Sequence, residues 1–184
     1  PTLDLAWGDW NGNGRLDLAV ANDGAADEIW LNLGGNFDTT TGWASQRASD
    51  RTTTAAWADI DGDGDLDLLA TPSNQALISV WVNAYPVMNE LQVTTAQNWA
   101  GLALADADAD GDVDIATVST NGPYHAFENA GGAFVTPSAW VSVSSEPGRD
   151  LLEADWYGDA YLDLSLIHIR RRRRSYACRA FSSS

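Results

Sequence analysis

The sequence contains a single cysteine and no lysine. The scarcity of cysteine limits the thiol, disulfide and zinc chemistry that the chain can carry. The single cysteine is Cys178, so residues 1–163 contain no disulfide and no thiol nucleophile. The same residues hold one histidine, His125, which excludes a zinc site built from histidine and cysteine. Long apolar runs are also missing: none approaches the roughly 18 residues that indicate a membrane-spanning helix. Thiol, zinc and membrane-span functions are therefore set aside.

Positive charge is scarce over most of the chain. Residues 1–163 carry all 26 acidic residues and four of the ten arginines, which gives this part a net charge of −22. Such a surface repels nucleic acid and anionic membranes and attracts cations. We therefore expect no nucleic-acid partner. No signal peptide is visible, but the chain begins at Pro1 close to a repeat motif, so we expect it to be part of a longer protein.

An acidic motif recurs at a near-constant period. Its leading aspartates are Asp9, Asp59, Asp106 and Asp155, separated by 50, 47 and 49 residues. A period near 50 with closely spaced turn residues is typical of β-propeller blades of four strands each. We predict an all-β fold, an incomplete β-propeller with about three four-stranded antiparallel blades and part of a fourth. The predicted repeats lie near residues 1–50, 51–98, 99–147 and 148–163.

Short strands with alternating apolar residues follow each motif. Residues 16–20, 66–70 and 113–117 are expected to be strands, and no segment shows a helical period. A second landmark, an aromatic residue two positions before an asparagine, follows each of the first three motifs by about 20 residues. We expect its tryptophans, Trp30 and Trp81, to pack in the core.

Each motif also contains a set of oxygen donors. Counted from the leading aspartate, positions one, three, five and nine offer side chains, position six is glycine, and position seven would offer its backbone carbonyl. The candidate metal ligands at positions one, three, five, seven and nine are Asp9, Asn11, Asn13, Arg15 and Asp17, then Asp59, Asp61, Asp63, Asp65 and Asp67, then Asp106, Asp108, Asp110, Asp112 and Asp114.

The donor chemistry favours calcium. Ca²⁺ accepts six to eight hard oxygen ligands, whereas these carboxylates would repel one another without a cation. The alternative is a set of plain acidic turns. An EF-hand is excluded, because its loop ends in a glutamate and lies between helices. Here the twelfth residues are Val20, Ala70 and Thr117, inside the predicted strands.

The pattern D-x-[DN]-x-[DN]-G-x-x-D, followed by a short strand and a later aromatic-x-Asn, resembles the FG-GAP/VCBS repeat over residues 1–163. Related repeats occur in integrin α-subunits, fungal propeller lectins, exported bacterial proteins and some polysaccharide lyases. The resemblance implies a propeller with Ca²⁺ in a loop between two strands of each blade. It also implies an extracellular, secreted or cell-surface location, and carbohydrate or an extracellular protein as partner.

Two function classes follow from this resemblance. The first is a non-catalytic calcium-binding module for adhesion or for carbohydrate or protein binding, with Trp43 and Trp140 as candidate ligand-binding residues. Both lie 34 residues after their leading aspartate, although packing would also explain them. The alternative is a part of a calcium-dependent polysaccharide-degrading enzyme, such as a lyase. General bases other than carboxylates are few, and no nucleophile motif accompanies His125, so no catalytic residue is predicted.

The fourth repeat departs from the pattern. Tyr157 stands at position three and Ala160 at position six, which leaves Asp155, Asp159 and Asp163 as acidic donors. We expect this loop to be degenerate, so that about three Ca²⁺ sites remain. Ligand charge and loop geometry predict that the second and third loops bind more tightly than the first, and the first more tightly than the fourth.

The tail, residues 164–184, reverses the charge. Six arginines lie within the last 15 residues. An arginine run can form a nucleic-acid or localisation patch. The abrupt change in mid-repeat, and the likeness of its first residues to a translated sequencing adapter, instead predict a non-native tail.

Overall fold

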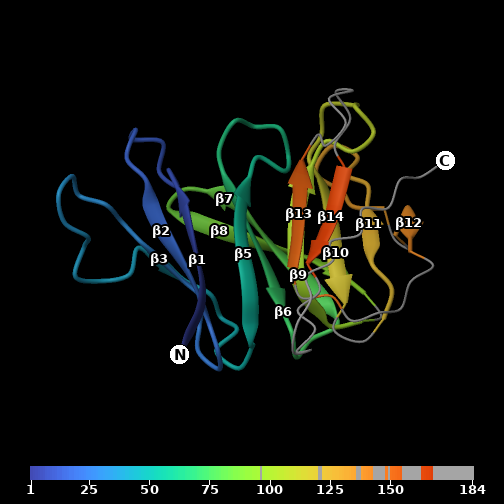
Figure 1. Cartoon of the computed structure of the whole chain (residues 1–184). Coiled ribbons are helices and arrows are strands. Elements are labelled where there is room, and N and C mark those ends of the chain that lie inside the picture. Colours follow the sequence, from blue (N-terminus) through green and yellow to red (C-terminus); the bar gives the residue numbers. More distant parts are fainter. Residues whose placement is uncertain are drawn as a thin grey trace.

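Three four-stranded antiparallel sheets and one two-stranded hairpin make up the fold (Figure 1). The computed structural model describes residues 1–95, 97–119, 122–135, 138–142, 148, 150–154 and 163–167. Every regular element over these residues is a strand and none is a helix. The described part accordingly contains no helix with the length and apolarity needed to cross a membrane.

Strands within each sheet follow one another in chain order. Blade 1 contains β1 (Thr2–Gly8), β2 (Asp17–Asn22), β3 (Glu28–Trp30) and β4 (Trp43–Ala44). Blade 2 contains β5 (Thr52–Ala58), β6 (Asp67–Pro72), β7 (Leu77–Ala84) and β8 (Val87–Thr94). Blade 3 contains β9 (Trp99–Ala105), β10 (Asp114–Ser119), β11 (His125–Phe127) and β12 (Trp140–Val141). The remaining hairpin contains β13 (Asp150–Ala154) and β14 (Asp163–Ile167).

The predicted strands are confirmed, because β2, β6 and β10 begin one residue after the bounds read from the sequence. Their registers are equivalent from blade to blade. Leu18 of β2 lies opposite Trp7 and Trp30, and Leu68 of β6 lies opposite Trp57 and Trp81. Residues that are directly opposite share one face of an antiparallel sheet. The alternation of the sequence thus places one apolar set on each face of a blade.

The hydrophobic core lies between neighbouring blades. One cluster joins blades 1 and 2, and its fully buried members include Ile29 and Leu68. The second cluster joins blades 2 and 3 and includes Val80 and Ile115. Burying one such aliphatic side chain stabilises the fold by about 1.5–3 kcal/mol. Because both clusters use residues of two sheets, each blade depends on its neighbour for its core.

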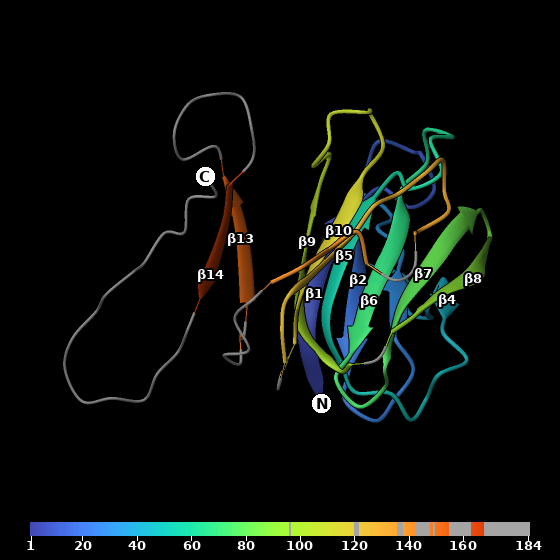
Figure 2. The same ribbon diagram turned by 90° about the vertical axis from the view of Figure 1, so that its right-hand side faces the viewer.

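The hairpin β13–β14 occupies the place of a fourth blade. Strand β13 lies beside β9, at the end of the row of sheets, and Figure 2 shows the hairpin on the side where β9 runs. Over the described residues the sheets form an open row that does not close into a ring. The predicted fold class, an incomplete propeller of about three antiparallel blades and part of a fourth, is confirmed.

Candidate metal centre

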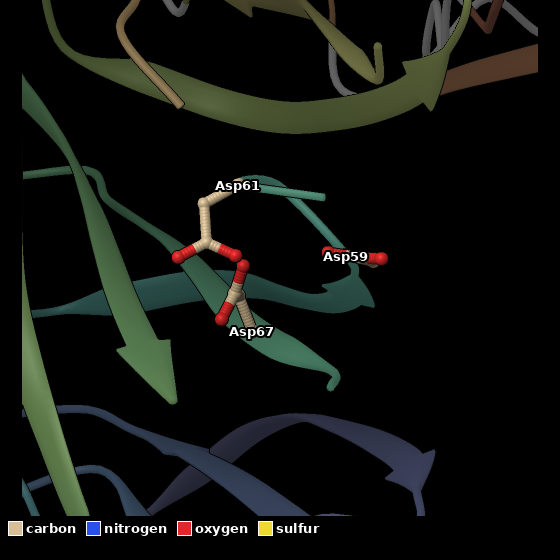
Figure 3. A group of neighbouring side chains, drawn as sticks. All are labelled: Asp59, Asp61 and Asp67. Atoms are coloured by element: carbon tan, nitrogen blue, oxygen red, sulfur yellow. The ribbon is translucent and has the colours of Figure 1, made fainter. Parts of the chain in front are cut away.

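The acidic motifs form the loops between the first and second strands of the three blades. Each loop begins where β1, β5 or β9 ends and finishes at the aspartate that opens β2, β6 or β10. The loop in blade 2 is shown in Figure 3, where the carboxylates of Asp61 and Asp67 face each other and that of Asp59 lies beside them. The period of the sequence therefore puts equivalent donor positions at the same edge of the three four-stranded sheets.

Positions one, three and nine converge in two of the loops. In blade 2, ligand atoms of Asp59, Asp61 and Asp67 all lie within 4.8 Å of one another. In blade 3 the same is true of Asp106, Asp108 and Asp114. Three carboxylates at this spacing can share one cation. The two groups arise at identical positions of the motif, which makes chance crowding of acidic residues a poor explanation.

Blade 1 has a related but less charged arrangement. Asp9 and Asp17 stand at positions one and nine, and Asn11 stands at position three. The Oδ1 atom of Asn11 is buried and has no hydrogen-bond partner. A buried acceptor without a partner costs about 1–3 kcal/mol unless something satisfies it. Position three of the first loop therefore keeps an acceptor available for a cation.

Position nine ties the loop to the third strand of its own blade. The carboxylate of Asp67 is fully buried, and its two oxygens accept the backbone N–H groups of Ile60 and Asn83, both at 2.8 Å. Equivalent bonds reach Asp17 from Trp10 and Asn32, and Asp114 from Ala107 and Asn129. Each carboxylate oxygen can accept more than one partner, so these bonds leave room for a cation.

Position one shapes the loop from its other end. In each loop an oxygen of this aspartate accepts the backbone N–H of the glycine at position six, at distances between 2.6 and 3.1 Å. The other oxygen accepts a further loop N–H, from Asn13, Gly62 or Asp110. The carboxylate is thereby held at the mouth of the loop before any cation is considered.

Position five is directed back into its own loop. The Oδ1 atoms of Asn13, Asp63 and Asp110 accept the N–H of the residue two positions later, at 2.9–3.0 Å. Neither Asp63 nor Asp110 belongs to the converging groups. Their role as ligands stays a prediction, and so does that of the position-seven carbonyls of Arg15, Asp65 and Asp112.

Burial and like charge raise the pKa of one carboxyl group in each converging set, Asp67 in blade 2 and Asp108 in blade 3. Burial raises the pKa of Asp67, and the neighbouring charges of Asp61 and Asp63 add to the effect. Desolvation and the charges of Asp110 and Asp114 raise the pKa of Asp108, although its side chain is exposed. A carboxylate whose pKa is raised by like charges gains the most when a cation arrives. The electrostatics of loops two and three therefore favour a cation.

The turn requires two left-handed residues, of which the sequence analysis found one. Position six is glycine in every loop, with φ between 81° and 100°. Position four also has positive φ: 66° at Gly12, 75° at Gly62 and 64° at Ala109. An L-residue with a Cβ is strained in this region, which glycine enters freely. The recurring glycine of loops one and two was the available signal for position four.

The asparagine of the aromatic landmark has a structural role that the sequence analysis did not assign. The Nδ2 atom of Asn83 donates to the carbonyl of Leu66 in its own blade and to that of Trp10 in blade 1, at 3.2 and 2.9 Å. Asn129 repeats this arrangement with Val113 and with Ile60 of blade 2, at 3.1 and 2.8 Å. Each asparagine latches its blade to the loop of the preceding blade. Its recurrence at a fixed place was the only signal.

Comparison with known proteins agrees with this architecture. Residues 9–70, from the first leading aspartate to strand β6, match the family model of the FG-GAP-like repeat. Residues 9–70 thus carry an FG-GAP-like repeat. No curated protein matches the chain in sequence.

A solved structure supports the propeller fold of the chain. A chain in the crystal structure of BBS1N in complex with ARL6DN, soaked with lead, superposes with a TM-score of 0.64 at 10% sequence identity. The match covers 90% of this chain and 51% of that chain. At this identity the likeness shows the fold alone, and the present chain spans about half the length of its neighbour.

The two candidate ligand-binding tryptophans occupy equivalent places on the outer strands of blades 1 and 3. Trp43 pairs with Ile29, and Trp140 pairs with Ala126, three residues before the latch asparagine in each blade. Trp43 is half-buried and meets Trp81 edge-to-face, with ring centroids 4.9 Å apart. Trp140 is 52% exposed. The ligand-binding role stays a prediction for both residues.

The two tryptophans that were expected in the core differ in burial. Trp81 is buried as predicted, whereas Trp30 is only half-buried.

His125 lies between two polar neighbours. Its Nδ1 is 2.7 Å from the hydroxyl of Ser138, and its Nε2 is 3.1 Å from Nε2 of Gln97. Burial lowers the pKa of His125, so that the neutral ring is favoured.

The fourth repeat and the tail lie mostly beyond the described residues. Asp155, Tyr157, Asp159 and Ala160 are outside them, and Asp163 is described only as the start of β14. The predicted degeneracy of the fourth loop and the non-native origin of residues 164–184 therefore stay predictions, and of this tail the structure describes residues 164–167 as part of β14.

Proposed function

We propose that this chain is a calcium-binding propeller-repeat module that works by binding rather than by catalysis. The observation that carries the proposal is the convergence of three carboxylates within 4.8 Å at the same positions of two loops. The FG-GAP-like repeat at residues 9–70 supports it, because the resemblance implies calcium at these loops. Residues at positions one, three and nine would hold the ion in each blade.

The donor set fits Ca²⁺ better than the other common cations. Every donor in the three loops is a carboxylate or amide oxygen, and such hard donors suit calcium or magnesium rather than zinc or copper. Magnesium demands a near-ideal octahedron, whereas calcium accepts irregular sets of six to eight oxygens. The loops are irregular turns in which some donors are already hydrogen-bonded, so calcium is the better match. The bound ion would supply the positive charge that these clusters lack.

The partner is proposed to be a carbohydrate or an extracellular protein at a cell surface. The acidic charge of residues 1–163 supports a partner other than nucleic acid. The exposed ring of Trp140 on strand β12 offers an apolar face of the kind on which sugar rings stack. A glycan array probed with and without calcium tests this part. Loss of a calcium-dependent signal in Trp140→Ala, but not in Trp43→Ala, would support the surface role of Trp140.

Calorimetric titration of the whole chain with CaCl₂ tests the metal sites. We call each group of three converging carboxylates a triad, which in blade 2 is Asp59, Asp61 and Asp67. Asp61→Ala removes one carboxylate of this triad, whereas Asp65→Ala removes an equal charge from the same loop outside the triad. We expect Asp61→Ala to lose one site from the isotherm and Asp65→Ala to keep all sites with slightly weaker binding. Asn11→Ala should weaken only the first loop. Equal isotherms for the Asp61 and Asp65 variants would show that the triads are acidic turns.

A further inference from the structure

The first metal loop contains two Asn-Gly pairs at positions where the other two loops have aspartate. Asn11 precedes Gly12, and Asn13 precedes Gly14. Asparagine is a thermolabile residue, because the next backbone nitrogen can attack its side-chain amide. Glycine in the next position favours this attack, since it has no Cβ to obstruct the approach. The two pairs are alike in sequence, so the structure around them decides which one can react.

The pair at Asn13 is held in an unreactive arrangement. The N–H of Gly14 donates to Oδ2 of Asp9 at 2.6 Å. A nitrogen that is hydrogen-bonded to a carboxylate gives up its proton less readily, because the negative charge opposes the loss. The side chain of Asn13 is fixed as well, since its Oδ1 accepts the N–H of Arg15 at 3.0 Å. Both groups that would have to meet are therefore already engaged.

The backbone nitrogen of Gly12 has no such restraint. Over the described residues its N–H has no hydrogen-bond partner, because Oδ1 of Asp9 accepts the N–H of Asn13 instead. Blade 2 differs, since the equivalent Gly62 donates to its leading aspartate at 2.9 Å. Gly12 is exposed, and no atom beyond its chain neighbours lies within 4 Å of the place where a Cβ would stand. The nitrogen is therefore open to solvent and to the side chain that precedes it.

The side chain of Asn11 is also unrestrained by hydrogen bonds. It makes none to any residue that the structure describes, and its Oδ1 atom is buried without a partner. The aspartates at the same position, Asp61 and Asp108, each accept the N–H of the residue two positions later, at 3.3 and 3.2 Å. No described hydrogen bond therefore has to break before Cγ of Asn11 turns toward the nitrogen of Gly12.

We propose that Asn11 is a site of spontaneous deamidation, and that its conversion to aspartate gives the first loop the charged position three of the other two loops. The nitrogen of Gly12 loses its proton and forms a bond to Cγ of Asn11. The bond from Cγ to Nδ2 breaks, and the amide nitrogen leaves as ammonia with that proton. The product is a succinimide ring, which water then opens. The net reaction consumes water and releases ammonia, and nothing is oxidised or reduced.

The ring opens in two ways, which have opposite consequences for the loop. Opening at Cγ gives a normal aspartate, as in Asp61 and Asp108. Opening at the backbone carbonyl gives isoaspartate, which inserts the side-chain methylene into the main chain and disrupts the turn. Calcium affinity rises with ligand charge and depends on loop geometry. Aspartate therefore tightens the first site, and isoaspartate weakens it. This consequence rests on the proposed calcium function, whereas the reaction itself does not.

Peptide mapping of the whole chain in chelator tests the reaction without any cation. Trypsin cleaves after Arg15, so both pairs lie in the peptide of residues 1–15, apart from the remaining Asn-Gly pair at Asn121. Digestion at mildly acidic pH limits conversion during the procedure, and fragment masses separate Asn11 from Asn13. In the folded chain we expect Asn11 to convert several-fold faster than Asn13. In urea the two should convert at similar rates, since each precedes glycine and the loop is lost.

Gly12→Ala is the matched control, because the natural Ala109 shows that alanine fits position four of such a loop. The substitution should slow the conversion of Asn11 several-fold, as the new methyl group obstructs the approach, and leave that of Asn13 unchanged. Equal conversion of Asn11 and Asn13 in the folded chain would overturn the proposal. No conversion of Asn11 over a period in which the unfolded chain converts would overturn it as well.

Calorimetric titration with CaCl₂ tests the consequence for the first site. Asn11→Asp reproduces the aspartate product and should raise the affinity of that site several-fold. Asn13→Asp adds the same charge at position five, whose side chain is directed back into its own loop, and should raise the affinity less. A first site that binds no more tightly in Asn11→Asp than in the parent chain would overturn the regulatory half of the proposal. If neither the parent chain nor the variants bind calcium, the proposed function fails and that half fails with it, while the deamidation measured in chelator is unaffected.

Discussion

Blades 1 and 2 have the same strand arrangement, but they differ in the charge of their loops and in how far their residues are buried. Both have the same strand order, and both have a register shift at the start of the first strand, between Thr2 and Asp4 and between Thr52 and Thr54. Strand β2 alternates between buried and half-buried residues, whereas every residue of β6 is buried. The comparison teaches that local sequence determines the blade and that the neighbouring blade determines how much of it is core.

The loops add a second difference between the same two blades. Positions three and five are the neutral Asn11 and Asn13 in blade 1 and the charged Asp61 and Asp63 in blade 2. The hydrogen bonds that shape the two loops are nevertheless equivalent at positions five and nine and at one oxygen of position one. The other oxygen of position one accepts from Asn13 in blade 1 and from Gly62 in blade 2. Most of these bonds are thus the same in a neutral and in a charged loop, and we expect charge to set the affinity for a cation.

The largest expected effect concerns the landmark tryptophans. Trp81→Ala should cost about 3–5 kcal/mol of unfolding free energy, as for a fully buried large side chain. Trp30→Ala should cost roughly half as much, because its ring is only half-buried. Urea denaturation measures both. Trp81→Phe is the matched control and should cost less than Trp81→Ala, since phenylalanine fills the equivalent place in blade 3. Equal losses from the two alanine variants would contradict the difference in burial.

A smaller effect is expected at the junction of the two blades. Gly8→Ala should destabilise the chain by about 1–3 kcal/mol, because the new methyl group meets the ring of Trp57. Combining it with Trp57→Leu reproduces the Ala58 and Leu104 pairing of the next junction. The double variant should therefore lose less than the sum of the two single losses. If the two single losses simply add in thermal unfolding, the side chains at positions 8 and 57 do not interact.

The loops can be made more alike at position four. Ala109→Gly should stabilise the chain by about 1 kcal/mol, because φ is positive there and the other two loops carry glycine. Gly62→Ala is the reciprocal change and should destabilise by a similar amount. Both values follow from chemical denaturation in chelator, which removes any contribution of cations. A destabilising Ala109→Gly would mean that the loop of blade 3 differs in backbone from that of blade 2.

The smallest expected effect is the pH-dependent contribution of His125, in blade 3, to the stability of the chain. His125 stands where blade 1 has Glu28 and blade 2 has Ser79, and burial lowers its pKa from the ordinary 6.5. The unfolded chain therefore binds the proton more readily than the folded chain. The contribution to stability is complete above pH 6.5 and declines as the pH falls toward the folded-state pKa.

His125→Gln is the variant that isolates this contribution, since the acidic residues are common to both proteins. Melting temperatures of the two proteins should converge or cross as the pH is lowered from 7.5 to 5.5. A difference that stays constant across this range, or one that grows in favour of the natural protein at low pH, would contradict the burial of a neutral ring.

Much of the fold could be predicted from the sequence because the repeat states it several times. The spacing of Asp9, Asp59 and Asp106 fixes the blade period, and the Leu-Asp-Leu pattern fixes the second strand. The sequence assigned positions one, three, five, seven and nine of each loop to a shared centre, and in blades 2 and 3 the structure brings together positions one, three and nine.

The rest depended on contacts between distant residues. The second oxygen of Asp67 is used by Asn83, sixteen residues away, and the amide of Asn83 reaches Trp10, 73 residues away. The repeat period of the sequence does not predict such bonds. The sequence also did not predict that the side chain at position five accepts a hydrogen bond from its own loop. An acidic side chain in the same sequence can either cap a turn or bind a cation. The half-burial of Trp30 depends on a neighbouring blade.

The most direct test of the account is the melting temperature of the chain in calcium and in chelator. An occupied site stabilises by about 2.7 kcal/mol at a free calcium concentration one hundred times its dissociation constant. The triads of blades 2 and 3 should together raise the melting temperature by roughly 10–20 °C. The double variant Asp61→Ala with Asp108→Ala should lose most of that rise. An identical melting temperature in calcium and in chelator for the natural chain would contradict the account.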